Sequence, residues 1–280
     1  MKKKTNIAAW ISGKILLYSA LIVGALLMLL PFIWMLSSSV KTQRDVFRFP
    51  IEWIPTTFQW GNYAEIWTKI PLLPYFNNTA KLTFIVMIAQ VITSSFAAYA
   101  FAKLHFRGRN QLFLLYIMTI AIPWQVYMVP QYIMMSYLGL SNSHLGLILM
   151  HTFTAFGVFM MRQFYMGVPD ELVEAARIDG LSEYGIWLKI MLPLSKPAIA
   201  TMCITSFVSE WNDFMGPLIY LSDDKLKTLQ LGIRMFIGQY SSDYQLIMAA
   251  SVIALIPVFI MYIFFQRYFV EGVATSGLKG

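Results

Sequence analysis

Six long apolar runs constrain this chain more than any other feature of its sequence. They cover about residues 15–37, 82–103, 111–130, 144–164, 197–221 and 244–267. Each has the roughly 20 residues that an α-helix, rising 1.5 Å per residue, needs to cross the core of a bilayer. The pattern predicts an all-α polytopic membrane protein with six transmembrane helices, organised as one domain over residues 1–280.

The composition supports this interpretation. The chain is 58% apolar and only 12% charged, whereas an average soluble protein is about 45–50% apolar and about 25% charged. The net charge of +7 would also suit nucleic-acid binding, but the basic residues flank the apolar runs instead of forming a stripe. We therefore expect no nucleic-acid partner.

The basic residues predict the orientation in the membrane. With the amino terminus inside, 13 of the 21 lysines and arginines lie on the inner side, where positive charge is enriched in membrane proteins. Six spans then place both termini and the loop 165–196 in the cytoplasm. The outer segment 38–80 is rich in aromatic residues and proline, which favours either a belt at the membrane interface or a docking surface for an extracellular partner.

The loop over residues 165–196, called the elbow below, carries strong local helix signals. Pro169 and Asp170 are typical of a first helical turn, and Gly180 suits the left-handed residue that ends a helix. Ser182 can cap a second helix, which Pro193 should stop. The elbow is therefore predicted to form a helix, a glycine turn and a second helix.

One face of the first elbow helix carries small side chains. Leu172, Ala175, Ala176 and Asp179 recur at helical spacing. Such a ridge could enter a groove on another protein, where Glu174 and Asp179 would meet basic residues. A DNA-binding helix-turn-helix has similar spacing, but the apolar second helix is unsuited to a major groove.

These residues carry a resemblance to a known family. Glu-Ala-Ala, then Gly after three residues, then Ile-x-Leu-Pro after nine more, is similar to the signature loop of bacterial ABC-importer permeases. Residues 98–102, 211–214 and 277–280 also resemble the carbohydrate branch of maltose-type permeases, and the likeness extends over essentially the whole chain.

The resemblance implies a function and a set of partners. The chain would be a non-enzymatic permease subunit in the bacterial inner membrane, for a carbohydrate of di- or oligosaccharide size. It would pair with a second homologous permease, two ATPase subunits that bind ATP and Mg²⁺, and an extracellular solute-binding protein. No cofactor or metal is expected in this chain, which lacks the phosphate-binding Gly-x4-Gly-Lys-Ser/Thr pattern. The implied ATPase-coupling residues are Glu174, Ala175, Ala176, Asp179, Gly180, Ile190, Leu192 and Pro193.

Polar side chains within the predicted spans are candidates for the substrate pathway, because such residues usually face a cavity or a partner. The candidates are Gln90, Ser94, Gln125, Trp211, Asn212 and Asp213. Aromatic faces can stack on sugar C–H groups, while amides and carboxylates accept hydroxyl hydrogen bonds. A structural role at helix interfaces is the competing interpretation. His151 is predicted to form a hydrogen bond between packed helices.

The sequence also bears on three other functions. A carrier driven by an ion gradient is disfavoured, because no internal repeat and no buried acid–base pair is evident. An importer of another solute, such as glycerol phosphate or amino acids, stays open, although a phosphate would call for a basic residue within a span. A membrane enzyme or metal protein is disfavoured, because His105, His144 and His151 are scattered and Cys203 is the sole cysteine.

Overall fold

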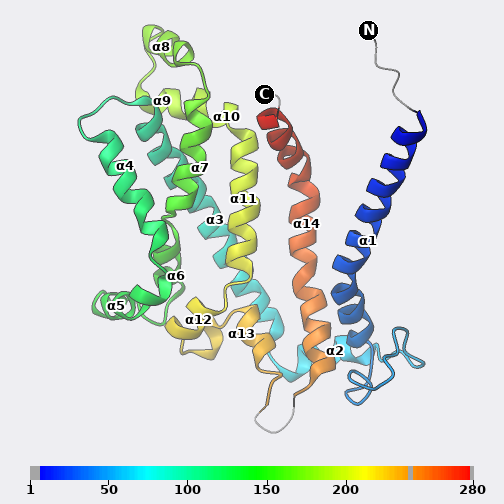
Figure 1. Ribbon diagram of the computed structural model, residues 1–280. Coiled ribbons are helices and arrows are strands. Elements are labelled where there is room, and N and C mark those ends of the chain that lie inside the picture. The colour runs from blue at the N-terminus through cyan, green and yellow to red at the C-terminus, as the bar shows by residue number, and fades with distance from the viewer. Residues whose placement is uncertain (1–6, 239–241, 278–280) are drawn as a thin grey trace. The chain divides into compact units, whose positions relative to one another are not determined.

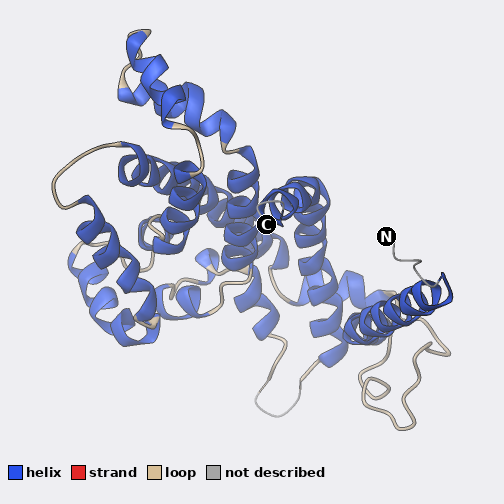
Figure 2. Cartoon of the chain, turned by 45° about the horizontal axis from the view of Figure 1, so that its top comes forward, coloured by secondary structure: helices blue, strands red, loops and turns tan. Residues whose placement is uncertain are grey.

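The computed structural model describes residues 7–238 and 242–277, and every regular element in these ranges is a helix (Figures 1 and 2). The lysines at positions 2–4 and residues 278–280 of the tail lie outside the described ranges. The chain forms two compact units, residues 1–70 with 233–254 and residues 71–232 with 255–280, and each is described by itself below. The predicted all-α class is confirmed for the described residues.

The first unit contains α1 (Ile7–Ser39), α2 (Gly61–Lys69) and the beginning of α14 (Tyr244–Gly277). From Gly13 to Leu36 most side chains of α1 are exposed, as expected for a helix that faces lipid. Near α14, the Lys69 ammonium lies 2.8 Å from Asp243 Oδ2, and this hydrogen bond raises the pKa of Lys69.

The segment between α1 and α2 is held by side chains that bind backbone carbonyls. Asn62 Nδ2 donates to the carbonyl oxygens of Ser39 and Lys41, each at 2.9 Å. Lys41 is buried and its ammonium donates to the carbonyl oxygen of Glu52. The aromatic rings of this segment point outward, and the Phe49 side chain is 90% exposed, which suits both interpretations of the predicted aromatic surface.

Besides the part of α14 from Leu255 onward, the second unit contains the remaining helices, the last of which, α13, crosses the unit boundary after Gly232. They are α3 (Leu72–Lys103), α4 (Arg109–Met118), η1 (Thr119–Ala121), α5 (Trp124–Tyr137), α6 (His144–His151), α7 (Ala155–Met166), α8 (Asp170–Ile178), α9 (Glu183–Ile186), the π-helical η2 (Trp187–Met191), α10 (Leu192–Leu194), α11 (Lys196–Trp211), α12 (Met215–Tyr220), η3 (Asp224–Leu226) and α13 (Leu229–Arg234). The long helix α3 packs along both α7 and α11 (Figure 1). These three helices position the sites described below.

Three helices are individually long and apolar enough to cross a membrane: Gly13–Ser39, Leu72–Lys103 and Tyr244–Arg267. The second begins ten residues before the predicted start at residue 82. Three further candidates are pairs of helices bent at a short break, by 101° between α4–η1 and α5, by 41° between α6 and α7, and by 80° between the α9–α10 segment and α11. The structure is thus compatible with six spans when each bent pair counts as one.

The predicted continuous spans 111–130 and 197–221 are wrong in detail. The helix of the first stops at Ala121 because Ile122 is extended ahead of Pro123, a conformation that proline favours in the residue before it. The second ends at Trp211, and α12 starts only at Met215. The predicted span 144–164 is also interrupted, since α6 ends at His151 and α7 starts at Ala155. The first break, at Ile122 and Pro123, is apolar, so the hydropathy of the sequence did not reveal it, whereas the polar residues Asn212 and Asp213 stand at the second break.

Replacing Asn62 with alanine should destabilise the first unit. The change removes the donor for two carbonyl groups at the end of α1, which typically lowers the free energy of unfolding by about 1–3 kcal/mol for a buried group. Thermal unfolding of the detergent-purified chain should show a lower midpoint for Asn62→Ala. Asn77→Ala, at an exposed position in α3, is the matched control, and equal midpoints for the two variants would contradict the prediction.

Candidate functional site

The first elbow helix forms as the sequence predicts. Helix α8 begins at Asp170 directly after Pro169, and both acidic residues of its first turn lie near the positive end of the helix dipole. Gly180 has a φ of +83°, which only glycine adopts without strain. Its N–H donates to the Arg177 carbonyl at 3.0 Å, and the Leu181 N–H donates to the Ala176 carbonyl at 3.0 Å. The helix therefore ends in a glycine turn.

The second elbow helix is longer and less regular than predicted. Ser182 Oγ accepts a hydrogen bond from the Gly185 N–H at 3.3 Å, which confirms the predicted cap. Helix α9 continues through π-helical η2 into α10, which ends at Leu194. Pro193 does not stop the helix, because it lies in the first turn of α10, where a proline N–H is not needed. The chain turns at Ser195 instead.

The predicted small face of α8 is only partly free. Ala176 and Val173 are buried in a hydrophobic core with Ile186 and Met191, so Ala176 contacts this chain's own core. Ala175 lies on the exposed side of the helix. The prediction that both alanines face outward is wrong for Ala176, because the second elbow helix packs against that side of α8.

The remaining predicted coupling residues lie at the elbow surface or partly within it. Glu174, Asp179, Gly180 and Pro193 are exposed, and Ile190 and Leu192 are half-buried. The same surface carries an apolar side chain that sequence reasoning missed, since the Ile178 side chain is 86% exposed. The outer side of the elbow thus combines carboxylates with a protruding apolar residue.

The last turn of α3 holds the start of α8. Lys103 is buried, and its ammonium donates to the Val168 carbonyl at 2.6 Å and to Asp170 Oδ1 at 2.5 Å. The Lys103 ammonium lowers the pKa of Asp170. The carboxylate is therefore ionised at neutral pH, and this link weakens only as the pH falls through the lowered pKa.

One turn earlier, α3 also holds the junction between the two elbow helices. The Tyr99 hydroxyl is hydrogen-bonded to the Glu183 carboxylate, which also accepts from Arg177 Nε at 2.7 Å and from its Nη2 at 3.3 Å. The hydrogen bond to Glu183 raises the pKa of Arg177. Tyr99 and Lys103 were not predicted as site residues, although their spacing of four places them on one face of the predicted second span.

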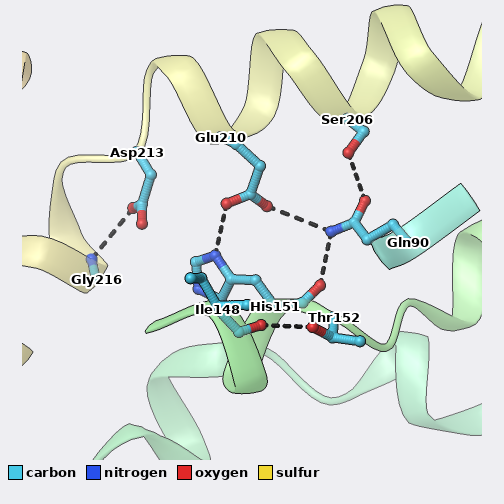
Figure 3. Close-up of polar contacts among 8 residues, drawn as sticks. All are labelled: Gln90, Ile148, His151, Thr152, Ser206, Glu210, Asp213 and Gly216. Carbon is cyan, nitrogen blue, oxygen red and sulfur yellow. Dashed lines mark hydrogen bonds and ion pairs between the residues drawn. The ribbon is translucent and has the colours of Figure 1, made fainter. Parts of the chain in front are cut away.

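A second group of polar side chains lies midway along α3, and Figure 3 shows its contacts. This polar cluster consists of Gln90 (α3), His151 (α6), Ser206 and Glu210 (α11). Ser206 Oγ donates to Gln90 Oε1 at 2.6 Å, and Gln90 Nε2 lies 3.4 Å from Glu210 Oε1. His151 Nδ1 lies 2.7 Å from Glu210 Oε2. The cluster joins three helices through polar contacts.

The His151–Glu210 pair corrects one argument from the sequence. No buried acid–base pair was evident there, yet the two side chains are only 26% and 11% exposed and form an ion pair when His151 is protonated. They are 59 residues apart, so their contact depends on helix packing that no local pattern predicts. The predicted hydrogen bond of His151 between packed helices is confirmed.

Side chains of α3 also form hydrogen bonds with the backbone carbonyl groups at the break between α6 and α7. The carbonyl oxygens of His151 and Thr152 lie at the break, where the helical hydrogen-bond ladder is interrupted. Gln90 Nε2 donates to the first at 2.7 Å, and Thr93 Oγ1 donates to the second at 2.9 Å. Side chains of α3 therefore replace the missing backbone donors, as a break at membrane depth requires.

The other predicted pathway residues are dispersed. Ser94 is fully buried, and its hydroxyl has no hydrogen-bond partner within the described chain. Trp211 is 1% exposed and stacks on Phe207 at a centroid distance of 5.4 Å, so its ring faces the protein's own core. Gln125 is exposed on α5.

Asn212 and Asp213 follow α11 at the break before α12. Asn212 Nδ2 donates to the Val208 carbonyl at 2.8 Å, and Asp213 Oδ1 accepts from the Gly216 N–H at 3.2 Å. Both side chains organise the local turn. Gln90 is the only predicted pathway residue within the polar cluster.

Comparison with known proteins identifies the architecture. Residues 90–275 match the family described as binding-protein-dependent transport system inner membrane component. The chain belongs to this family. The matched range includes both the polar cluster and the elbow, and the resemblance inferred from the elbow is confirmed.

The permease has relatives that match over nearly their whole length. It is 35% identical over 284 residues to the arabinooligosaccharides transport system permease protein AraQ of Halalkalibacterium halodurans, with 100% of both chains covered. It is 31% identical to the sn-glycerol-3-phosphate transport system permease protein UgpE of Pectobacterium atrosepticum, covering 91% of this chain and 94% of that protein.

A solved structure shares the fold of the permease. A chain of a bacterial ABC transporter involved in the import of the acidic polysaccharide alginate superposes with a TM-score of 0.81 at 24% identity, covering 96% of this chain and 99% of that chain. Its family makes the permease a transport subunit of a bacterial inner membrane, and the superposition gives it the fold of an ABC-importer permease.

Removing the Glu183 carboxylate should loosen the elbow of the permease. Glu183→Ala deletes the acceptor shared by Tyr99 and Arg177, and exposed charge pairs contribute up to about 1 kcal/mol. Limited trypsin digestion should cleave after Arg177 about threefold to fivefold faster in this variant. Glu174→Ala removes an exposed glutamate from the same loop and should leave the rate unchanged. Equal cleavage rates for both variants would contradict the prediction that the contacts of Glu183 stabilise the elbow.

The two charged members of the polar cluster should stabilise the permease jointly. In a double-mutant cycle of His151→Ala and Glu210→Ala, measured by thermal unfolding in detergent, we expect an interaction energy of about 0.5–3 kcal/mol. The exposed His105 provides the control, because His105→Ala and Glu210→Ala should be additive. Additivity in both cycles would show that the His151–Glu210 contact does not contribute to stability.

Proposed function

We propose that this permease is the membrane-spanning subunit of an ATP-driven importer for a neutral di- or oligosaccharide. Family membership supports the transport role. The arabinooligosaccharide permease AraQ, which is similar over the whole chain, supports the carbohydrate substrate. The family assignment also favours an ATP-driven importer over the ion-driven carrier considered from the sequence.

In this proposal, residues 1–280 form a single permease domain that crosses the membrane six times, each bent helix pair counting as one span. Both termini and the elbow lie in the cytoplasm, as the distribution of basic residues predicts. A second, homologous permease completes the pathway, and an extracellular solute-binding protein delivers the sugar. The alginate importer supports the last partner, since a further structure of that transporter includes a periplasmic protein.

The contacts and the exposed residues of the elbow support the proposed coupling role. Its inner side is attached to α3 through Lys103 and Tyr99, whereas its outer side exposes Ile178 and Glu174. An ATPase subunit that binds the outer side would therefore move a loop directly connected to a long helix. Two such ATPase subunits would bind ATP and Mg²⁺ and perform the hydrolysis, while this chain would transmit the movement.

Disrupting the glycine turn should uncouple transport without preventing membrane insertion. Proline cannot adopt the φ of +83° found at Gly180, so Gly180→Pro should reorient the outer side of the elbow. We expect uptake by the complete importer to fall to background, with normal amounts of permease in the membrane. Sugar-stimulated ATPase activity at the wild-type rate would contradict the coupling role.

Gly185→Ala is the matched control, because a Cβ at Gly185 would meet its neighbours at ordinary distances of 3.5 Å or more. It should retain uptake. A second variant, Ile178→Asp, tests the contact itself, since it places a charge on the exposed apolar residue. It should reduce co-purification of the ATPase subunit with the permease.

Glycerol phosphate is the second candidate substrate, because the UgpE protein is also similar over most of the chain. A phosphate would require a cationic partner within the spans. Arg162 of α7 is already engaged, since its Nε donates to the Phe101 carbonyl at 3.2 Å and its guanidinium lies over the Phe113 ring. Uptake of labelled arabinotriose with and without excess glycerol 3-phosphate distinguishes the two substrates.

A further inference from the structure

A groove with a mixed polar and apolar lining lies beside the polar cluster, on the surface formed by α3, α7 and α11. It has a volume of about 330 Å³ and is lined by Gln90, Thr154, Phe156, Gly157, Met202, Thr205, Ser206 and Ser209. Gln90 stands near the middle of α3, and Thr154 directly follows the break between α6 and α7. The groove is therefore at mid-span, where discontinuous helices often surround transported solutes.

The groove contains hydroxyl groups with unused hydrogen-bonding capacity. The single hydroxyl proton of Thr205 is shared between the carbonyls of Thr201 and Met202, at Oγ1–O distances of 3.0 and 3.1 Å, and its lone pairs stay available. Thr154 Oγ1 accepts from the Gly157 N–H at 3.3 Å, which leaves its proton available. Ser209 is exposed at the groove. Polar groups facing lipid at this depth would be unfavourable.

Gly157 lets α7 lie close to α3 and α11 beside the groove. A Cβ at this position would lie only 2.6 Å from Met202 Cε and 2.6 Å from Ser94 Oγ. Ser94 is fully buried, and its hydroxyl has no hydrogen-bond partner within the described chain. The buried Ser94 hydroxyl thus lies directly behind the glycine, outside the lining of the groove.

The lining indicates the chemistry of the ligand. No lysine, arginine, aspartate or glutamate is among the lining residues, so the groove suits a neutral molecule. Phe156, which is about half exposed, offers an aromatic face for apolar C–H groups, while the serines and threonines can pair with hydroxyl groups. The volume is near the lower end of the roughly 300–1,000 Å³ typical of ligand pockets, which fits part of an oligosaccharide better than a whole chain.

We propose that this groove is a transport subsite that contacts one neutral sugar residue during passage through the permease. This inference rests on the proposed carbohydrate function. In the subsite, Phe156, Thr154, Thr205 and Ser209 contact the sugar. None of these four residues was predicted from the sequence. A small number of uncharged contacts binds a sugar weakly, as a transport site requires, because the sugar must also be released from it.

Uptake of radiolabelled arabinotriose tests the subsite in the complete importer, with both permeases and the ATPases in proteoliposomes and saturating binding protein. Phe156→Ala and Ser209→Leu should each lower the maximal uptake rate about tenfold, since they remove a stacking face or fill the groove. Binding-protein-stimulated ATP hydrolysis should persist, because neither residue touches the elbow. Val208→Leu, exposed on the same helix outside the groove, should transport normally.

A cysteine variant provides a readout that does not depend on transport rate. In a Cys203→Ser background, Ser209→Cys should react with a neutral, water-soluble thiol reagent, and arabinotriose with binding protein and ATP should slow the reaction. A thiol that is unreactive in the assembled importer would show that the partner permease or lipid covers the groove, which overturns the proposal. Unchanged uptake in both groove variants would also overturn it.

The same uptake assay separates the proposed function from the proposed subsite. If the wild-type importer does not transport arabinotriose, the proposed oligosaccharide function is refuted for this sugar. If the wild type transports it and the groove variants do as well, only the subsite is refuted.

Discussion

The need to satisfy backbone carbonyls without water governs the second unit. Within a bilayer, an interrupted helix is tolerated only when other groups take over its lost hydrogen bonds. Helix α3 supplies them at the break between α6 and α7, through the side chains of Gln90 and Thr93. The same helix packs along α7 and α11. The polar cluster depends on the Gln90 amide of α3, while the adjacent groove takes its hydroxyl groups from α11 and from Thr154 ahead of α7.

A different kind of contact operates at the end of α3 that reaches the elbow. There, Lys103 and Tyr99 bind charged and carbonyl groups of α8 and of the junction that follows it. A buried lysine requires a partner of opposite charge, and Asp170 provides one. One continuous helix therefore connects the loop proposed to meet an ATPase with the mid-span region proposed to meet the sugar.

Local signals explain what could be predicted from the sequence. The glycine turn at Gly180 and the cap at Ser182 depend on residues only a few positions away, and both formed as expected. The outward orientation of Ala176 was predicted wrongly, because the first elbow helix has small or apolar residues on two sides. Which side is buried depends on the second elbow helix. The contacts of Glu210 with His151 and of Glu183 with Tyr99 link residues 59 and 84 positions apart, and no spacing pattern encodes them.

The tight approach at Gly157 limits how these helices can move. Met202 of α11, Ser94 of α3 and Thr154 all lie within 2.7 Å of the position that a Cβ would occupy. Helices in such close contact interlock, because sliding one past another would drive side-chain atoms into the backbone. A displacement that begins at the elbow should therefore turn α3, α7 and α11 together as a rigid body, and the hinges that permit this rotation must lie outside the three helices.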